Sequence, residues 1–142
     1  MRVSKLRVEE IMTTDLHTVG PDEPVDLVGK VMEWKGVRHI PVENMDLRLV
    51  GLLTVFDVLQ YLGQRGPDSP ASTVGDLMTQ DPPTVAPTAP IGVALAVMRE
   101  QKVDCLPVVQ PGNRLVGIVT ERDFIQVIGR VFENDPAVPE PD

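Results

Sequence analysis

The sequence predicts an α+β fold built from two copies of one small unit. Shifting the chain by 66 positions places residues 8–62 on residues 74–128 without a gap, and about twenty aligned positions are identical. Each copy holds apolar residues at helical spacing and two short apolar runs typical of strands. Because a unit of about 55 residues buries little surface alone, we expect the copies to share a core.

The first half of each copy should hold one long helix. In the first copy, a helical turn over residues 8–12 leads to an extended segment at residues 18–19. We expect Asp22 to cap the helix that follows, because a carboxylate accepts hydrogen bonds from the free amides at a helix start. Pro24 suits the first turn of this helix, and Gly36 suits its end.

The second half of each copy should hold two strands and another helix. In the first copy, the apolar runs at residues 39–42 and 48–53 predict strands joined by a polar turn. Thr54 should open a helix over residues 55–62, and Gly63 should stop that helix.

The second copy repeats this order. Thr88 is the expected cap, Pro90 lies in the first turn, and the helix should cover residues 91–101. Strands are expected over residues 106–109 and 115–120, joined by a turn rich in glycine and proline.

These patterns divide the chain into four parts. The first repeat with its lead-in covers residues 1–63, and the second repeat covers residues 74–132. Residues 64–73 contain the glycine, serine and prolines typical of a linker. Residues 133–142 are acidic and rich in proline, so we expect a flexible tail.

Composition excludes several classes of function. The formal net charge of −8 at pH 7 would repel the phosphates of a nucleic acid, so we expect no nucleic-acid partner. Cys105 is the single cysteine, which excludes an internal disulfide and a cysteine-rich zinc site, and its apolar neighbours predict a buried thiol. We expect no metal. No stretch approaches the ~20 apolar residues of a membrane-spanning helix, so we expect no membrane partner and a cytoplasmic location.

The most informative local pattern is a glycine followed three and six residues later by threonine and aspartate, at residues 51–57 and again at residues 117–123. The glycine permits close approach to a strand, and the threonine and aspartate lie where a helix start leaves amides free. Such a start favours anions, and a nearby carboxylate can accept hydrogen bonds from both ribose hydroxyls. The pattern therefore predicts two nucleotide cradles, formed by Gly51, Thr54 and Asp57 and by Gly117, Thr120 and Asp123.

A structural interpretation of the same pattern stays open. Thr-x-x-Asp is close to a capping box, in which Thr54 caps the helix and Asp57 accepts a hydrogen bond from the amide of Thr54. Under this interpretation the residues stabilise a helix start and bind no ligand. The recurrence of the glycine at the same offset in both copies favours the cradle.

In this order, the repeated motifs resemble a tandem pair of CBS domains, named for cystathionine beta-synthase. The resemblance rests on the opening Val-x-x-h-Met-Thr at residues 8–13 and 74–79, where h is an apolar residue. It also rests on residues 37–42 and 103–108 and on the two glycine motifs. Each motif is weak alone, but their order and duplication are specific.

This resemblance implies a β-α-β-β-α unit in each copy, with the two related by pseudo-twofold symmetry and their sheets packed together. It implies clefts between the repeats for adenine-containing ligands such as AMP, ADP, ATP or S-adenosylmethionine, with no required cofactor. It also implies a disc-like homodimer. Because the sequence contains no fused effector domain, the output would pass through a separate effector protein or through self-association.

The resemblance also assigns roles to residues by motif position. Thr54 with Asp57, and Thr120 with Asp123, would hold phosphate and ribose. The base would lie near the two extended segments and the backbone that precedes two strand prolines. The remaining candidate ligand contacts are Thr18, Val19, Arg38, His39, Ile40, Pro41, Thr84, Val85, Leu106, Pro107 and Arg122.

The two expected clefts differ in charge. Arg38 can bind a phosphate through two hydrogen bonds, whereas its counterpart Asp104 would repel a phosphate. The second copy carries Arg122 where the first has Phe56. The cleft of Arg38 is thus the first choice for a phosphorylated ligand, although solvated surface charge also accounts for both arginines.

Two functional hypotheses follow. No nucleophile or acid–base pair with a supporting group is evident in the sequence, so we expect no enzyme activity. The leading hypothesis is a regulatory module that senses an adenine nucleotide or a related adenosyl ligand in the cleft between the repeats. The alternative is a ligand-free interaction or dimerisation module, which Asp104 favours because its charge opposes phosphate binding.

Overall fold

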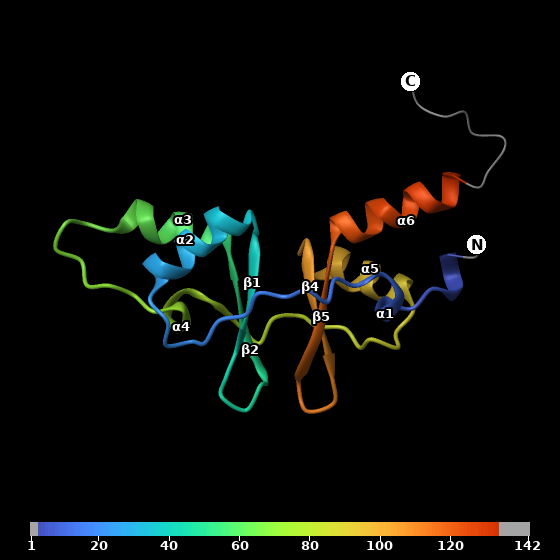
Figure 1. Cartoon of the computed structure of the whole chain (residues 1–142), viewed down its shortest axis with the longest axis horizontal. Helices are drawn as coiled ribbons and strands as arrows, with labels where there is room; N and C mark the ends of the chain where they lie inside the picture. Colours follow the sequence, from blue (N-terminus) through green and yellow to red (C-terminus); the bar gives the residue numbers. More distant parts are fainter. Residues whose placement is uncertain (1–2, 134–142) are drawn as a thin grey trace, which may run out of the picture. The chain divides into compact units, whose positions relative to one another are not determined.

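The computed structural model describes residues 3–133 and shows a mixed helical and stranded chain with antiparallel sheets (Figure 1). The elements are, in chain order, η1 (Val3–Lys5), α1 (Val8–Ile11), α2 (Val25–Lys35), β1 (His39–Glu43), β2 (Leu49–Thr54), α3 (Val55–Gln64), α4 (Val74–Leu77), β3 (Thr79–Gln80), α5 (Ile91–Gln101), β4 (Cys105–Gln110), β5 (Arg114–Thr120) and α6 (Glu121–Glu133). The predicted order of helices and hairpin strands is confirmed for both copies, and α5 has the predicted boundaries. The extended segments expected at residues 18–19 and 84–85 form only single β-bridges, at Val19 and Val85. All four predicted strands are present, with ends displaced by one residue at most.

The described residues form two compact units that do not follow the order of the repeats. The Asp57 unit, named here for the aspartate it contains, consists of residues 16–82 and 111–115. The Asp123 unit contains residues 3–15, 83–110 and 116–133. Each unit therefore combines the N-terminal segment of one copy with the long helices of the other. We call these segments the lead-ins, residues 3–15 in the first copy and residues 72–82 in the second.

The sheet of the Asp57 unit has the order β1-β2-β3 and is antiparallel. Its register places His39 opposite Thr54, and the lead-in strand β3 pairs Thr79 with Leu52. In the Asp123 unit β4 pairs with β5, and the other lead-in makes a single bridge to β5. Figure 1 shows the β1–β2 hairpin accompanied by α2, α3 and α4, and the β4–β5 hairpin accompanied by α1, α5 and α6.

The buried apolar residues form two clusters, one in each unit, and each cluster contains residues of both copies, so the expectation that the copies share a core is confirmed. Val8 and Ile11 of the first lead-in belong to the cluster of the Asp123 unit. Val74 of the second lead-in belongs to the cluster of the Asp57 unit. Each repeat is too small to bury enough apolar surface alone, and it acquires the missing surface from the lead-in of the other copy.

The side-chain caps predicted at Asp22 and Thr88 are wrong. Both long helices begin directly after a proline, and neither has a side-chain cap. Instead, the first amide of α2, on Val25, donates to the lead-in carbonyl of Ser72 at 3.0 Å, and α5 begins with the equivalent bond. A lead-in carbonyl thus accepts the hydrogen bond from an amide that a side-chain cap would otherwise have to satisfy.

The helix ends also differ from prediction. Gly63 does not stop α3, which continues to Gln64, because a glycine inside a helix costs only about 1 kcal/mol. The second copy's last helix, α6, includes Glu133, the first residue of the expected tail. The rest of that tail, residues 134–142, lies outside the described residues. Between residues 3 and 133, no helix has both the length and the apolar character needed to cross a membrane.

Candidate functional site

In the Asp57 unit, the threonine and aspartate of the glycine motif form the start of α3. The amide of Thr54 donates to Asp57 Oδ2 at 2.8 Å, and the amide of Asp57 donates to Thr54 Oγ1 at 3.3 Å. The capping box is therefore confirmed. The capping box uses only one oxygen of the Asp57 carboxylate, Oδ2. Among residues 3–133, no donor reaches Asp57 Oδ1, and the side chain is half-buried.

Arg38 and His39 lie beside this helix start. The amide of Val55, the first residue of α3, donates to the carbonyl of Arg38 at 3.0 Å, and His39 pairs with Thr54 in the sheet. The Arg38 side chain is exposed, and it forms no ion pair with the described carboxylates. We call Arg38, Thr54 and Asp57 the Asp57 cradle. It presents a free carboxylate oxygen at a helix start next to an arginine.

In the Asp123 unit, both carboxylate oxygens of Asp123 accept hydrogen bonds. Oδ2 accepts from the amide of Thr120 at 2.9 Å and from its hydroxyl at 3.5 Å. Oδ1 accepts from the hydroxyl of Thr13 at 3.0 Å. Asp123 is only 6% exposed. We call Thr120 and Asp123 the Asp123 cradle, and its carboxylate is already satisfied by the protein.

Thr13 and Thr79 occupy equivalent places in the two lead-ins, but only Thr13 bonds to a cradle. Thr13 is held to Ile118 by backbone hydrogen bonds of 2.9 and 3.0 Å. Thr79 lies beside β2 in the equivalent register, and there the pairing continues for a second residue before the chain turns at Asp81, with φ of 46°. Within the described part of the chain, the Thr79 hydroxyl makes no hydrogen bond to Asp57.

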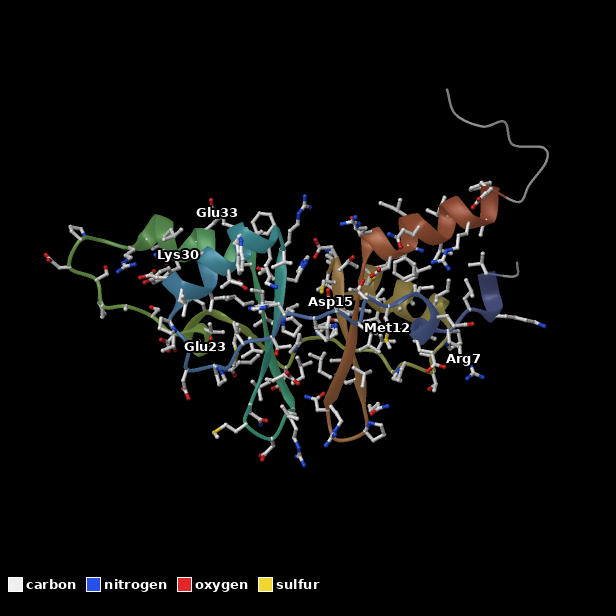
Figure 2. The ribbon with its side chains drawn as sticks, viewed as in Figure 1. Arg7, Met12, Asp15, Glu23, Lys30 and Glu33 are labelled. Atoms are coloured by element: carbon white, nitrogen blue, oxygen red, sulfur yellow. The ribbon has the colours of Figure 1, made fainter. Side chains whose placement is uncertain are left out.

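The two motif glycines are contacted by the methionines of the lead-ins. A Cβ atom on Gly51 would lie 2.8 Å from Cγ of Met78. A Cβ atom on Gly117 would lie 2.5 Å from Sδ of Met12, which is labelled beside the β4–β5 hairpin in Figure 2. The close approach predicted at both glycines is therefore made by methionine. This packing explains why the glycine motif and the Met-Thr motif occur together in each unit.

The residues predicted to lie near the base are largely held in strand pairing. The amide of Val19 donates to the carbonyl of Pro41 at 3.2 Å, and the amide of Val85 donates to the carbonyl of Pro107 at 3.1 Å. These four side chains are buried in the two units. Among the other candidates, Ile40 and Leu106 are buried, Thr18 and Thr84 are half-buried, and Arg122 is exposed.

Cys105 is buried in β4, as predicted. Burial raises the pKa of its thiol well above the ordinary value, and the carboxylates of Asp104 and Asp123 raise that pKa further. The thiol is therefore a poor nucleophile, because the thiolate is the reactive form. The described residues contain no group of three His, Cys, Asp or Glu side chains placed to hold a metal ion.

Thr13 is the contact residue that the sequence analysis misses. The available signal is the Met-Thr pair at residues 12–13, which recurs at residues 78–79. Nothing in one sequence shows that a lead-in reaches the helix start of the other copy. The contact between Thr13 and Asp123 becomes evident only in the folded structure.

Comparison with known proteins identifies the repeated unit. The sequence matches the family model of the CBS domain at residues 8–64 and at residues 74–130. The chain belongs to the CBS domain family. The resemblance drawn from the motifs is thereby confirmed, and each matched segment contains one repeat of the sequence.

The CBS relatives include a much longer enzyme and a protein of similar length. Homoserine O-acetyltransferase of Methanococcoides burtonii is 32% identical over 86% of this chain, which spans only 24% of that enzyme. A CBS domain-containing protein of Dictyostelium discoideum is 28% identical, and the match covers 93% of this chain and 97% of that protein. CBSX2 of Arabidopsis thaliana, whose crystal structure has been solved in complex with AMP, is 29% identical in sequence to this chain, and the two structures match with a TM-score of 0.78. That match covers 88% of this chain and 97% of CBSX2.

Proposed function

We propose that this CBS pair is a non-catalytic regulatory sensor that binds an adenosine-containing ligand at the Asp57 cradle. The observation that carries the proposal is Asp57 Oδ1, an acceptor that no donor reaches within residues 3–133. A ribose presents two vicinal hydroxyl donors, which suit a carboxylate at a helix start. AMP is the first candidate, and ADP, ATP and S-adenosylmethionine share its adenosine group.

The charges at the cradle suit a phosphate attached to that ribose. The start of the ten-residue helix α3 carries partial positive charge and free amides. Arg38 adds an exposed guanidinium at the same place, since its carbonyl accepts the first amide of α3. An arginine can bind two phosphate oxygens at once. AMP is therefore expected to bind more tightly than adenosine.

A relative supports the choice of AMP as the first ligand to test. CBSX2, which is 29% identical to this chain, has been crystallised in complex with AMP. Its coverage of 88% of this chain includes both repeats in a fold with a TM-score of 0.78. We extend that ligand class to this chain because the Asp57 cradle supplies the acceptor and the cation that AMP requires.

The test is calorimetric titration of AMP into wild-type protein and into Asp57→Asn. The asparagine keeps one oxygen to accept from the amide of Thr54, so the helix cap is retained, but its amide nitrogen cannot accept from ribose. Hydrogen bonds to charged groups contribute about 1.5–3 kcal/mol, which predicts a loss of affinity of roughly 10- to 100-fold. Unchanged AMP affinity in Asp57→Asn would contradict the proposed site.

The chain offers a matched control for this variant. Asp76 forms the same capping contact at the start of α4, where the amide of Thr73 donates to its Oδ2 at 3.0 Å. Asp76→Asn therefore makes the same chemical change at an exposed capping box outside the cradle. It should bind AMP with wild-type affinity.

Regulation requires an output, and we place it in self-association or in a separate effector protein. The outer face of α3 exposes apolar side chains, including Phe56 at 76% and Leu59 at 56%. Exposed apolar faces of this kind favour a protein partner. We propose a second copy of this chain as that partner, so Leu59→Glu should raise the dimer dissociation constant in sedimentation equilibrium. Leu95→Glu on α5 is the control.

A ligand-free interaction module remains the second candidate, because the Asp123 cradle is closed by the protein itself. This candidate predicts dimerisation without any thermal shift from AMP, ADP, ATP or S-adenosylmethionine. The sensor predicts a shift of several degrees, since a ligand at 100 times its Kd stabilises the folded state by about 2.7 kcal/mol.

A further inference from the structure

The Asp123 cradle has the same motif as the Asp57 cradle, but its aspartate accepts hydrogen bonds at both oxygens rather than at one. We infer that the hydroxyl of Thr13 blocks the Asp123 cradle and limits the wild-type chain to one adenosine ligand. This inference rests on the proposed function of the Asp57 cradle, but it concerns the other unit. Thr13 is thus the residue that determines how many ligands one chain binds.

The block follows from the state of the Asp123 carboxylate. Oδ1 accepts from the hydroxyl of Thr13 at 3.0 Å, and Oδ2 accepts from the amide of Thr120 at 2.9 Å. Asp123 is only 6% exposed. Oδ1 has a second lone pair, but Asp123 is so little exposed that a ribose hydroxyl can reach this oxygen only by taking the place of the Thr13 hydroxyl. The exchange replaces one hydroxyl donor with another, so it yields little net free energy against the cost of ordering a ligand.

Apart from this contact, the Asp123 cradle keeps a helix start and an arginine that suit a phosphorylated ligand, although Asp104 occupies the position that Arg38 has in the other copy. Thr120 and Asp123 precede and open the 13-residue helix α6, whose start favours anions. Arg122 is exposed in the first turn of the same helix. In the other unit, Thr79 makes no bond to Asp57 among the described residues. The Thr13 hydroxyl is therefore the contact whose removal should open the cradle.

Thr13→Val removes this hydroxyl with little other change. Valine has the shape of threonine, is favoured in extended backbone, and keeps both backbone hydrogen bonds to Ile118, at 2.9 and 3.0 Å. The substitution leaves Asp123 Oδ1 as a buried acceptor that lacks its donor. A ribose hydroxyl can then supply the missing hydrogen bond instead of competing for it.

The test is calorimetric titration of AMP into wild type, Thr13→Val and the matched control Thr79→Val. We expect one AMP per chain for wild type and for Thr79→Val, and two for Thr13→Val. The added binding should disappear in Thr13→Val with Asp123→Asn. No gain in AMP stoichiometry over wild type in folded Thr13→Val, verified by circular dichroism, would overturn the inference.

The same titrations separate this inference from the proposed function. If wild type binds no AMP but Thr13→Val binds one through Asp123, the Asp57 proposal fails and the inference holds. If Asp57→Asn abolishes wild-type binding and Thr13→Val gains no second AMP, the Asp57 proposal holds and the inference fails. If Thr13→Val binds no AMP at all, the inference is also wrong.

Discussion

The Asp57 cradle and the Asp123 cradle share a Gly-x-x-Thr-x-x-Asp motif, yet their aspartates are in different states. Asp123 is buried and accepts hydrogen bonds at both oxygens, one of them from Thr13. Asp57 is half-buried and accepts at Oδ2 alone from the described residues. The motif therefore does not determine which hydrogen bonds the aspartate accepts. Under the proposed function, the lead-in supplied by the other copy determines whether the cradle accepts a ribose.

The comparison also shows how a duplicated unit can acquire two roles. In both units the lead-in methionine packs on the motif glycine, and the next residue is a threonine beside the cradle. The hydroxyl of Thr13 donates to the aspartate of its unit, whereas the hydroxyl of Thr79 makes no hydrogen bond to Asp57 among the described residues. Under the proposed function, the two copies diverge through one hydroxyl outside the motif, while the fold is retained.

The largest expected difference is in the stability cost of removing each carboxylate. Asp123→Ala removes a buried carboxylate that accepts from the amide of half-buried Thr120 and from the hydroxyl of exposed Thr13, so we expect a loss of about 2 kcal/mol. Asp57→Ala removes a capping contact, which costs about 1 kcal/mol. Urea unfolding of both variants measures this difference. Equal losses would show that the two aspartates contribute equally to the free energy of unfolding.

The glycine–methionine contacts predict the next effect. Gly51→Ala and Gly117→Ala each place a methyl group against methionine and backbone, so each should destabilise the fold by about 2 kcal/mol. Gly51→Ala should lose more, because its Cβ would approach Met78 and the carbonyl of Thr79 more closely. In a double-mutant cycle, Met78→Ala should recover part of the loss. Additive losses would exclude the contact as the cause.

Cys105 provides a pH-dependent difference between the copies. Its pKa is raised in the folded state above the ordinary 9.0, so the stabilisation it provides is complete below pH 9 and is lost as the pH rises further. The slope should be about 1.4 kcal/mol per pH unit above the unfolded pKa. Thermal unfolding of wild type and Cys105→Val between pH 8 and pH 11 isolates this contribution. Parallel curves for the two proteins would contradict it.

The smallest effect concerns the arginines. Arg38→Ala should weaken AMP binding about fivefold, or about 1 kcal/mol, because exposure to solvent reduces the contribution of its charge. It should leave the affinity for adenosine unchanged, since adenosine has no phosphate. Arg122→Ala should change neither affinity while the Asp123 cradle is closed. An equal effect of the two arginines on AMP binding would mean that the cradles are equivalent.

Much of the fold could be predicted from this sequence because the signals are local. The repeat, the strand runs and the α5 boundaries depend on spacing within a few residues, and the structure has them where the patterns predict. The caps at Asp22 and Thr88 could not be predicted correctly. A carbonyl from a distant lead-in takes the place of the cap, and no local pattern encodes it.

The site was predictable only in part, for the same reason. The pattern at Thr54 and Asp57 supports both a capping box and a cradle, and the cap is confirmed while an oxygen remains available. At Asp123 the deciding contact comes from Thr13, which lies 110 residues away in the sequence. The exchange of lead-ins between copies brings these residues together. A sequence alone does not show which lead-in residue lies beside the aspartate of the other copy.

The central claim is that Asp57, and not Asp123, holds an adenosine ligand in the wild-type chain. An AMP titration followed by two-dimensional amide NMR of labelled protein tests it most directly. The largest and saturable shifts should occur at the amides of Thr54, Val55 and Asp57, with Thr120 and Asp123 nearly unchanged. Shifts centred on Thr120 and Asp123, or no shifts at millimolar AMP, would contradict the claim.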